Sequence, residues 1–69
     1  MRILIVEDEQ RLAQLMHRVL SQERFDVEVA HDGLEGLDRA LGGGFDALVV
    51  DRMLPGLDGV DLIRELREA

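Results

Sequence analysis

The chain has 69 residues, a net charge of −7 and no cysteine. This length permits one domain with a small core, and 15 acids against 8 bases oppose binding to the nucleic acid backbone. Without cysteine the chain has no disulfide or thiolate metal site, which is typical of a reducing cytoplasm. The apolar start meets an acidic run at Glu7, too early for a signal peptide or a membrane span. We therefore expect a cytoplasmic protein with no membrane partner.

Segments typical of strands and helices alternate along the first half of the chain. Residues 3–6 are apolar and mostly β-branched, which predicts a strand buried on both faces. Apolar residues then recur at the spacing of one helix face: Leu12, Leu15, Met16, Val19 and Leu20. Residues 27–30 alternate between apolar and polar, which predicts a short strand nearer the edge of the sheet.

A second helix is predicted after this strand. Asp32 and Glu35 have the spacing of a capping box, in which an acid caps the helix and a glutamate follows three residues later. The predicted inward face of the helix holds Leu34, Leu37 and Leu41. The glycines at 42–44 are expected to end the helix, because glycine adopts the left-handed conformation at little cost.

Residues 47–50 predict a third strand that is again buried and ends at Asp51. The run 54–56 is a turn signal, and Asp58 is placed to cap a third helix. Three apolar residues of that helix lie at helical spacing: Val60, Ile63 and Leu66. Strands that alternate with helices predict an α/β fold, with a parallel sheet, helices on both faces and right-handed crossovers.

Acidic residues follow two of the predicted strands. Glu7 and Asp8 come directly after the first, and Asp51 follows the third. If these strands are neighbours, about 4.8 Å apart, the three carboxylates meet at the edge where parallel sheets bind ligands. A hard divalent cation such as Mg²⁺ would offset their repulsion, and a carboxylate can accept a phosphoryl group. The alternative is that these acids are solvated residues that end strands at the surface.

The run at 49–59, Val-Val-Asp-Arg-Met-Leu-Pro-Gly-Leu-Asp-Gly, resembles the phosphoacceptor segment of bacterial response-regulator receiver domains. Residues 3–9 resemble the first strand and acidic pair of that family, and residues 30–35 resemble the start of its second helix. The resemblance implies a flavodoxin-like, doubly wound parallel sheet, truncated after its third helix. We therefore expect a partial receiver domain over residues 1–69, of the OmpR-type class of winged-helix transcription factors.

The resemblance also implies a role for each acid. Asp51 would accept a phosphoryl group from a sensor histidine kinase. Asp8, Asp51 and the backbone carbonyl of Met53 would coordinate Mg²⁺, and Glu7 would act through water. These roles describe a signalling domain rather than an enzyme, and DNA would be bound only by an output domain that this chain does not contain.

The family's serine or threonine after the fourth strand and its lysine after the fifth have no counterpart here, since the chain contains no lysine. We therefore expect weak Mg²⁺ binding and poor phosphorylation of the isolated chain. The third strand should expose an apolar edge, and unpaired edges favour pairing with another chain. Two copies of the chain are thus expected to associate.

Two other functions are compatible with the residues. One is an interaction or assembly module that keeps the fold without the chemistry. The other is a magnesium-dependent phosphohydrolase with an aspartyl nucleophile. We rank that reaction last, because Met53 stands where such enzymes carry a second aspartate.

Overall fold

The computed structural model of the chain describes residues 1–51 and 58–68. Strands and helices alternate within these ranges, in the predicted order. They are β1 (Arg2–Val6), α1 (Gln10–Gln22), β2 (Asp26–Ala30), α2 (Gly33–Gly42), β3 (Ala47–Val50) and α3 (Gly59–Glu68). In this part of the chain no helix is both long and apolar enough to cross a membrane.

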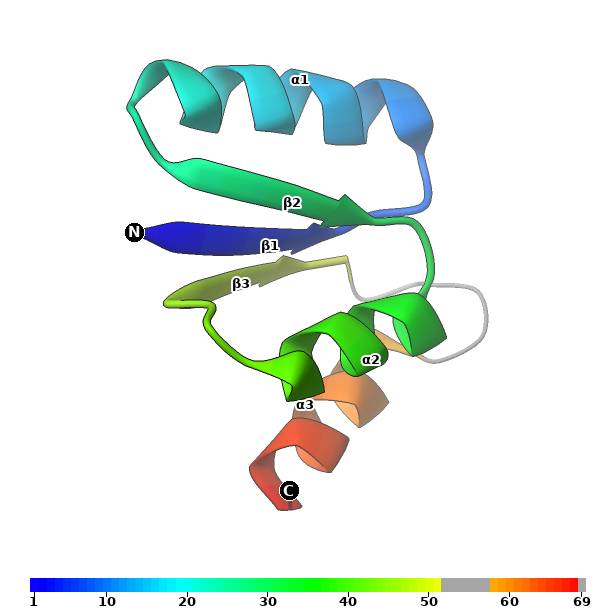
Figure 1. Ribbon diagram of the computed structural model, residues 1–69. Helices are drawn as coiled ribbons and strands as arrows, with labels where there is room; N and C mark the ends of the chain where they lie inside the picture. The colour runs from blue at the N-terminus through cyan, green and yellow to red at the C-terminus, as the bar shows by residue number, and fades with distance from the viewer. Residues whose placement is uncertain (52–57, 69) are drawn as a thin grey trace.

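The three strands form one parallel sheet in the order β2-β1-β3. In the register of the sheet, Leu4 at the centre of β1 pairs with Glu28 of β2 and with Leu48 of β3. Figure 1 shows α1 on one side of the sheet and α2 and α3 on the other. The predicted α/β architecture is therefore confirmed, and the first and third strands are neighbours.

Side chains at helix ends have the local roles that the sequence predicts. Asp32 caps α2 by accepting a hydrogen bond from the backbone N–H of Glu35, at 2.7 Å. Asp58 caps α3 in the same way, at 2.8 Å from the backbone nitrogen of Val60. The α2 helix ends before Gly43, whose φ of 85° lies in the left-handed region that glycine adopts at least cost.

The main core lies between the sheet and the α2–α3 pair. Its fully buried side chains are Leu4, Val6, Ala30 and Leu62. The α2 helix approaches β1 closely at Gly36, where a Cβ atom would lie 2.7 Å from Cγ1 of Val6. A larger residue at Gly36 would therefore force α2 away from β1, because a packed core has no free volume for it.

Burial differs from the predicted pattern on all three helices. Leu34 and Leu41 were expected to face inward, but both are more than half exposed, and Leu37 alone of the three packs on the core. On α3 the fully buried leucine is Leu62, which the spacing did not single out. Apolar residues on the predicted face of α1 are also exposed: Leu12, Leu15 and Val19. These side chains lie on surfaces that no other described element covers.

The third strand is also less buried than predicted. Leu48 and Val49 are 36% and 38% exposed, because in the described part of the chain β3 is an edge strand, with β1 as its one neighbour. The expectation that β3 exposes an apolar edge is confirmed, and the expectation that it is fully buried is wrong.

Candidate functional site

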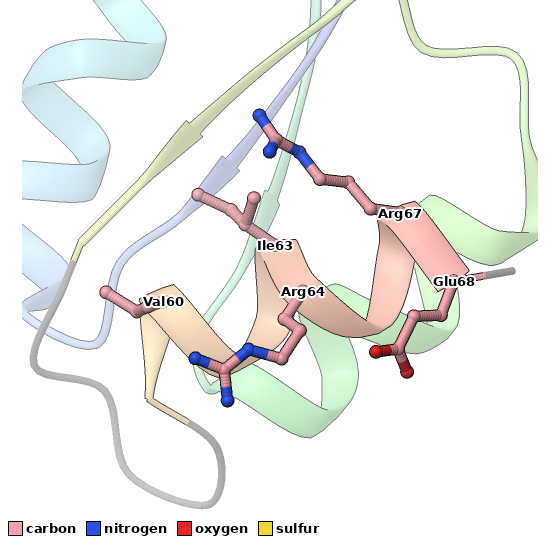
Figure 2. A pocket seen from close by; sticks show the side chains of 5 residues that line it. All are labelled: Val60, Ile63, Arg64, Arg67 and Glu68. Atoms are coloured by element: carbon pink, nitrogen blue, oxygen red, sulfur yellow. The ribbon is translucent and has the colours of Figure 1, made fainter.

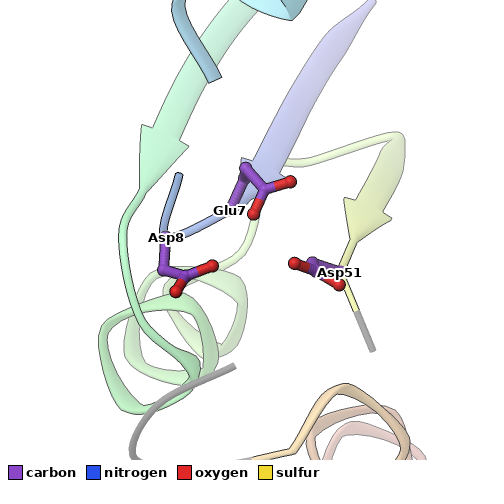
Figure 3. A group of neighbouring side chains, drawn as sticks. All are labelled: Glu7, Asp8 and Asp51. Carbon is purple, nitrogen blue, oxygen red and sulfur yellow. The ribbon is translucent and has the colours of Figure 1, made fainter. Parts of the chain in front are cut away.

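The candidate site lies at the carboxyl ends of β1 and β3. The pairing of Val6 with Val50 extends into the next residue, where the backbone N–H of Asp51 donates to the carbonyl oxygen of Val6 at 3.0 Å. This bond fixes Asp51 beside the point where β1 ends and Glu7 and Asp8 begin. Each of the three acids contributes one oxygen, and these oxygens all lie within 4.8 Å of one another. Figure 3 shows the three carboxylates gathered around one small space.

Exposure to solvent differs among the three carboxylates. Glu7 is buried, with 6% of its surface exposed, whereas Asp51 is half-buried and Asp8 is exposed. The site is therefore closed on the side of Glu7 and open on the side of Asp8. Asp51 itself is partly exposed to solvent.

Burial and the neighbouring acids change the ionisation of Glu7. Burial raises the pKa of Glu7 above its usual value, and the nearby carboxylates of Asp51 and Asp8 raise it further. A hydrogen bond from the backbone N–H of Glu9, at 3.3 Å, acts in the opposite direction. Three oxygen donors that repel one another match the preference of Mg²⁺, a hard cation that binds carboxylates and keeps several waters. The donor set therefore fits a divalent cation.

Replacing Glu7 by glutamine is expected to stabilise the metal-free chain at neutral pH. Because folding raises the pKa of Glu7, the folded chain holds a proton that the unfolded chain releases. The stability that this proton adds is fully present below the pKa that Glu7 has in the unfolded chain. It is lost as the pH rises through the higher pKa that Glu7 has in the folded chain. Thermal unfolding should thus show a Tm advantage of Glu7→Gln that widens from acidic to neutral pH. An advantage that shrinks with rising pH would contradict this explanation.

Some predicted site features fall outside the described residues. Met53, whose backbone carbonyl is an expected Mg²⁺ ligand, and the predicted turn at 54–56 both lie in the range that the structure does not describe. Sequence reasoning also missed one residue beside the cluster. Glu9 caps α1 with its side chain, and the signal was its place directly before the first apolar turn of that helix.

Comparisons with known proteins identify the family. A sequence model described as "Response regulator receiver domain" matches residues 3–69. The transcriptional regulatory protein YkoG of Bacillus subtilis is 46% identical over 66 residues, which are 96% of this chain and 29% of that protein. The response regulator ArlR of Staphylococcus saprophyticus is 42% identical over 67 residues, 97% of this chain and 30% of that protein. The chain thus spans about a third of the length of these relatives.

Solved structures agree with this result. The response regulator TrrA of Thermotoga maritima, crystallised in complex with Mg²⁺ and BeF, matches with a TM-score of 0.92 and 31% identity over 97% of this chain and 58% of that one. The receiver domain of Ssk1 from Saccharomyces cerevisiae, crystallised with the phosphotransfer protein Ypd1, matches with a TM-score of 0.94 and 25% identity over 99% of this chain and 47% of that one. From this family match and from the parallel β2-β1-β3 sheet, we conclude that the chain belongs to the receiver domains of two-component response regulators.

Proposed function

We propose that this chain forms the phosphoacceptor part of a response regulator, with Asp51 as the residue that receives the phosphoryl group from a sensor histidine kinase. The observation that carries this proposal is the meeting of three carboxylates from two neighbouring strands within 4.8 Å. Surface acids repel one another and gain nothing from such a cluster. An arrangement of this kind is typical of a site that binds a cation and a phosphoryl group.

The proposed Mg²⁺ ligands are Asp8 and Asp51, the backbone carbonyl of Met53, and Glu7 through a water molecule. Magnesium would supply positive charge that offsets the carboxylates and the incoming phosphoryl oxygens. The magnesium complex of TrrA supports this ligand chemistry for a receiver of the same fold. Asp8, as the most exposed acid of the cluster, faces the side from which solvent and ligand enter.

The transfer step itself needs little from the protein beyond position. A carboxylate oxygen of Asp51 attacks the phosphorus atom of a phosphohistidine, and a new P–O bond forms as the P–N bond breaks. The histidine nitrogen leaves with the electron pair of the broken bond. The nucleophile in this step is a carboxylate oxygen, so no general base has to remove a proton from it. Its half-buried position beside β1 limits the directions from which the donor can approach.

The proposed context is a cytoplasmic two-component system. The donor is a histidine kinase or a phosphotransfer protein, and the similarity to Ssk1, which was crystallised with Ypd1, supports a partner of this class. The similarity to the transcriptional regulatory protein YkoG and to ArlR supports a DNA-binding output domain of the OmpR type. That domain and the remainder of the receiver would belong to a longer protein, in which residues 1–69 are the first part of the receiver.

Phosphorylation by acetyl phosphate in the presence of Mg²⁺, followed by intact mass, tests the proposed role. The isolated chain is expected to be labelled slowly and in low yield, because it lacks the family's lysine. Joining residues 1–69 to the matching second half of the ArlR receiver should raise the rate by about tenfold or more, equivalent to about 1.4 kcal/mol of barrier. Asp51→Asn in the joined chain is the control and should remain unlabelled. A joined, folded chain that is not labelled would refute the phosphoacceptor role.

A second candidate function is self-association, with or without phosphorylation. Leu48 and Val49 of β3 are partly exposed at the sheet edge, and unpaired edge strands favour pairing with another chain. A groove of about 260 Å³ lies on α3, and Figure 2 shows the side chains that line it. Its lining residues are Val60, Ile63, Arg64, Arg67 and Glu68.

Sedimentation velocity tests this association directly. The wild-type chain should form dimers at high concentration, and Val49→Lys should shift it toward monomer, because a lysine on the edge opposes strand pairing. Val19→Lys, on the exposed side of α1, makes the same change of residue away from the edge and is the control. A folded wild-type monomer at high concentration would argue against the dimer.

A further inference from the structure

The loop between β1 and α1 contains only residues 7–9, and Asp8 is its exposed middle residue. Both neighbours of Asp8 are held in place by hydrogen bonds, although Asp8 itself lies at the surface. We infer that Glu9 is a positioning residue that fixes the carboxylate of Asp8 for cation binding, an inference that rests on the proposed function of the site.

The first neighbour, Glu7, ties the loop to the sheet. Its backbone N–H donates to the carbonyl oxygen of Ala30 at 2.9 Å, which continues the β1–β2 pairing by one residue. Its side chain accepts the backbone N–H of Glu9 at 3.3 Å. The loop is therefore closed on itself across Asp8, by a bond from residue 9 back to residue 7.

The second neighbour, Glu9, ties the loop to the helix through three hydrogen bonds. One carboxylate oxygen accepts the backbone N–H of Arg11 at 3.2 Å, and the other accepts that of Leu12 at 2.9 Å. The carbonyl oxygen of Glu9 accepts the backbone N–H of Ala13 at 3.0 Å. Ala13 is buried against the sheet, so the cap fixes residue 9 to a part of α1 that is itself held in the core.

The choice of glutamate at this position is informative. Aspartate, asparagine and serine are the preferred helix caps, and glutamate is not among them. At Glu9 the longer side chain places one oxygen on each of two successive N–H groups, so the backbone that precedes it has little freedom to rotate. The backbone on both sides of Asp8 is therefore restrained. A carboxylate that is held in position before the cation arrives loses less conformational entropy when it binds.

The test is a Mg²⁺ titration of the full 69-residue chain, read from the backbone amide shift of Asp51 in ¹H–¹⁵N spectra. Glu9→Ala removes the cap and should weaken Mg²⁺ binding by about tenfold, the usual minimum for loss of a group that orients a metal ligand. Glu9→Gln keeps an oxygen that can cap but removes the charge, and it should retain most of the affinity. Glu9→Asp keeps a preferred cap but shortens the side chain that reaches both N–H groups, so its affinity should lie between those of wild type and Glu9→Ala.

Asp32→Ala is the matched control, since Asp32 caps α2 from a loop that carries no member of the cluster. It should lower thermal stability about as much as Glu9→Ala and leave Mg²⁺ affinity unchanged. Equal Mg²⁺ affinity of wild type and Glu9→Ala would overturn the inference. An affinity of Glu9→Gln as low as that of Glu9→Ala would also overturn it, because the effect would then come from the charge of residue 9. If wild type shows no Mg²⁺-dependent shift at Asp51, the metal site itself fails.

Discussion

Asp51→Asn is expected to weaken Mg²⁺ binding by roughly tenfold to a hundredfold or more. Loss of a group that only orients a metal ligand already costs about that much, and this substitution removes a charged ligand itself. The amide of asparagine keeps the shape of the side chain, so the β1–β3 pairing that places residue 51 beside Val6 should persist. A Mg²⁺ titration followed by the backbone amide shifts of Glu7 and Asp8 measures the loss.

The same substitution should have the opposite effect on the metal-free chain. Because the Asp51 carboxylate raises the pKa of Glu7, its removal relieves a repulsion and should raise Tm by a few degrees. Asp38→Asn, on the exposed side of α2, is the control for loss of one negative charge and should change neither quantity appreciably. A substitution that weakens Mg²⁺ binding and also lowers the metal-free Tm would indicate a damaged fold rather than a lost ligand.

Leu62→Ala is expected to cost about 2–5 kcal/mol of unfolding free energy, the range for leucine-to-alanine changes in packed cores. Leu62 is fully buried and joins α3 to Leu4 and Val6 of the central strand. A chain of this size has a small margin of stability, so the variant should be largely unfolded at room temperature. Urea unfolding followed by far-ultraviolet circular dichroism gives the free energy and, through its slope, the surface exposed.

Ile63→Ala is the matched control, because Ile63 is the next residue of the same helix and has as many side-chain atoms. Its side chain is 43% exposed and lines the outer groove of α3. The variant should therefore lose less than half the stability that Leu62→Ala loses. Equal losses at the two positions would mean that the packing of α3 on the sheet differs from that described.

Much of the fold follows from local sequence patterns. The β-branched run at 3–6 predicted a strand that is observed as β1, and the acids Asp32 and Asp58 predicted two helix starts that are confirmed. These features depend on residues that are close together in the sequence. Their physical causes are the preference of β-branched residues for strands and the hydrogen bonds of a cap, and neither needs a partner from elsewhere in the chain.

Burial was harder to predict because it depends on what packs against each face. The spacing of apolar residues on α3 fits a face through Ile63 as well as one through Leu62, and only the position of α3 beside α2 and β1 decides between them. In the same way, the burial of β3 depends on what covers it, and within the described residues β3 lies at the edge of the sheet, with β1 as its neighbour on one side.

The candidate site was predictable to the extent that it depends on topology. Once β1 and β3 are neighbours, Glu7, Asp8 and Asp51 must meet, whatever the details of their rotamers. The cap by Glu9 was not predictable from residue preference, because glutamate is an uncommon cap. Its place before the first apolar turn of α1 was the one sequence signal, and the distances to Arg11 and Leu12 establish the cap.

Paramagnetic line broadening by Mn²⁺ tests the central claim, that the three clustered carboxylates bind one divalent cation. Mn²⁺ uses the same oxygen ligands as Mg²⁺, and it broadens the amide signals nearest to it. Substoichiometric Mn²⁺ should broaden Glu7, Asp8 and Asp51 first, and excess Mg²⁺ should restore them. Asp26 and Asp46 contact Arg2 at the amino ends of the strands, opposite the cluster. Their amide signals should stay sharp. Broadening that begins at Asp26 and Asp46, or that spreads evenly over all acids, would contradict the claim.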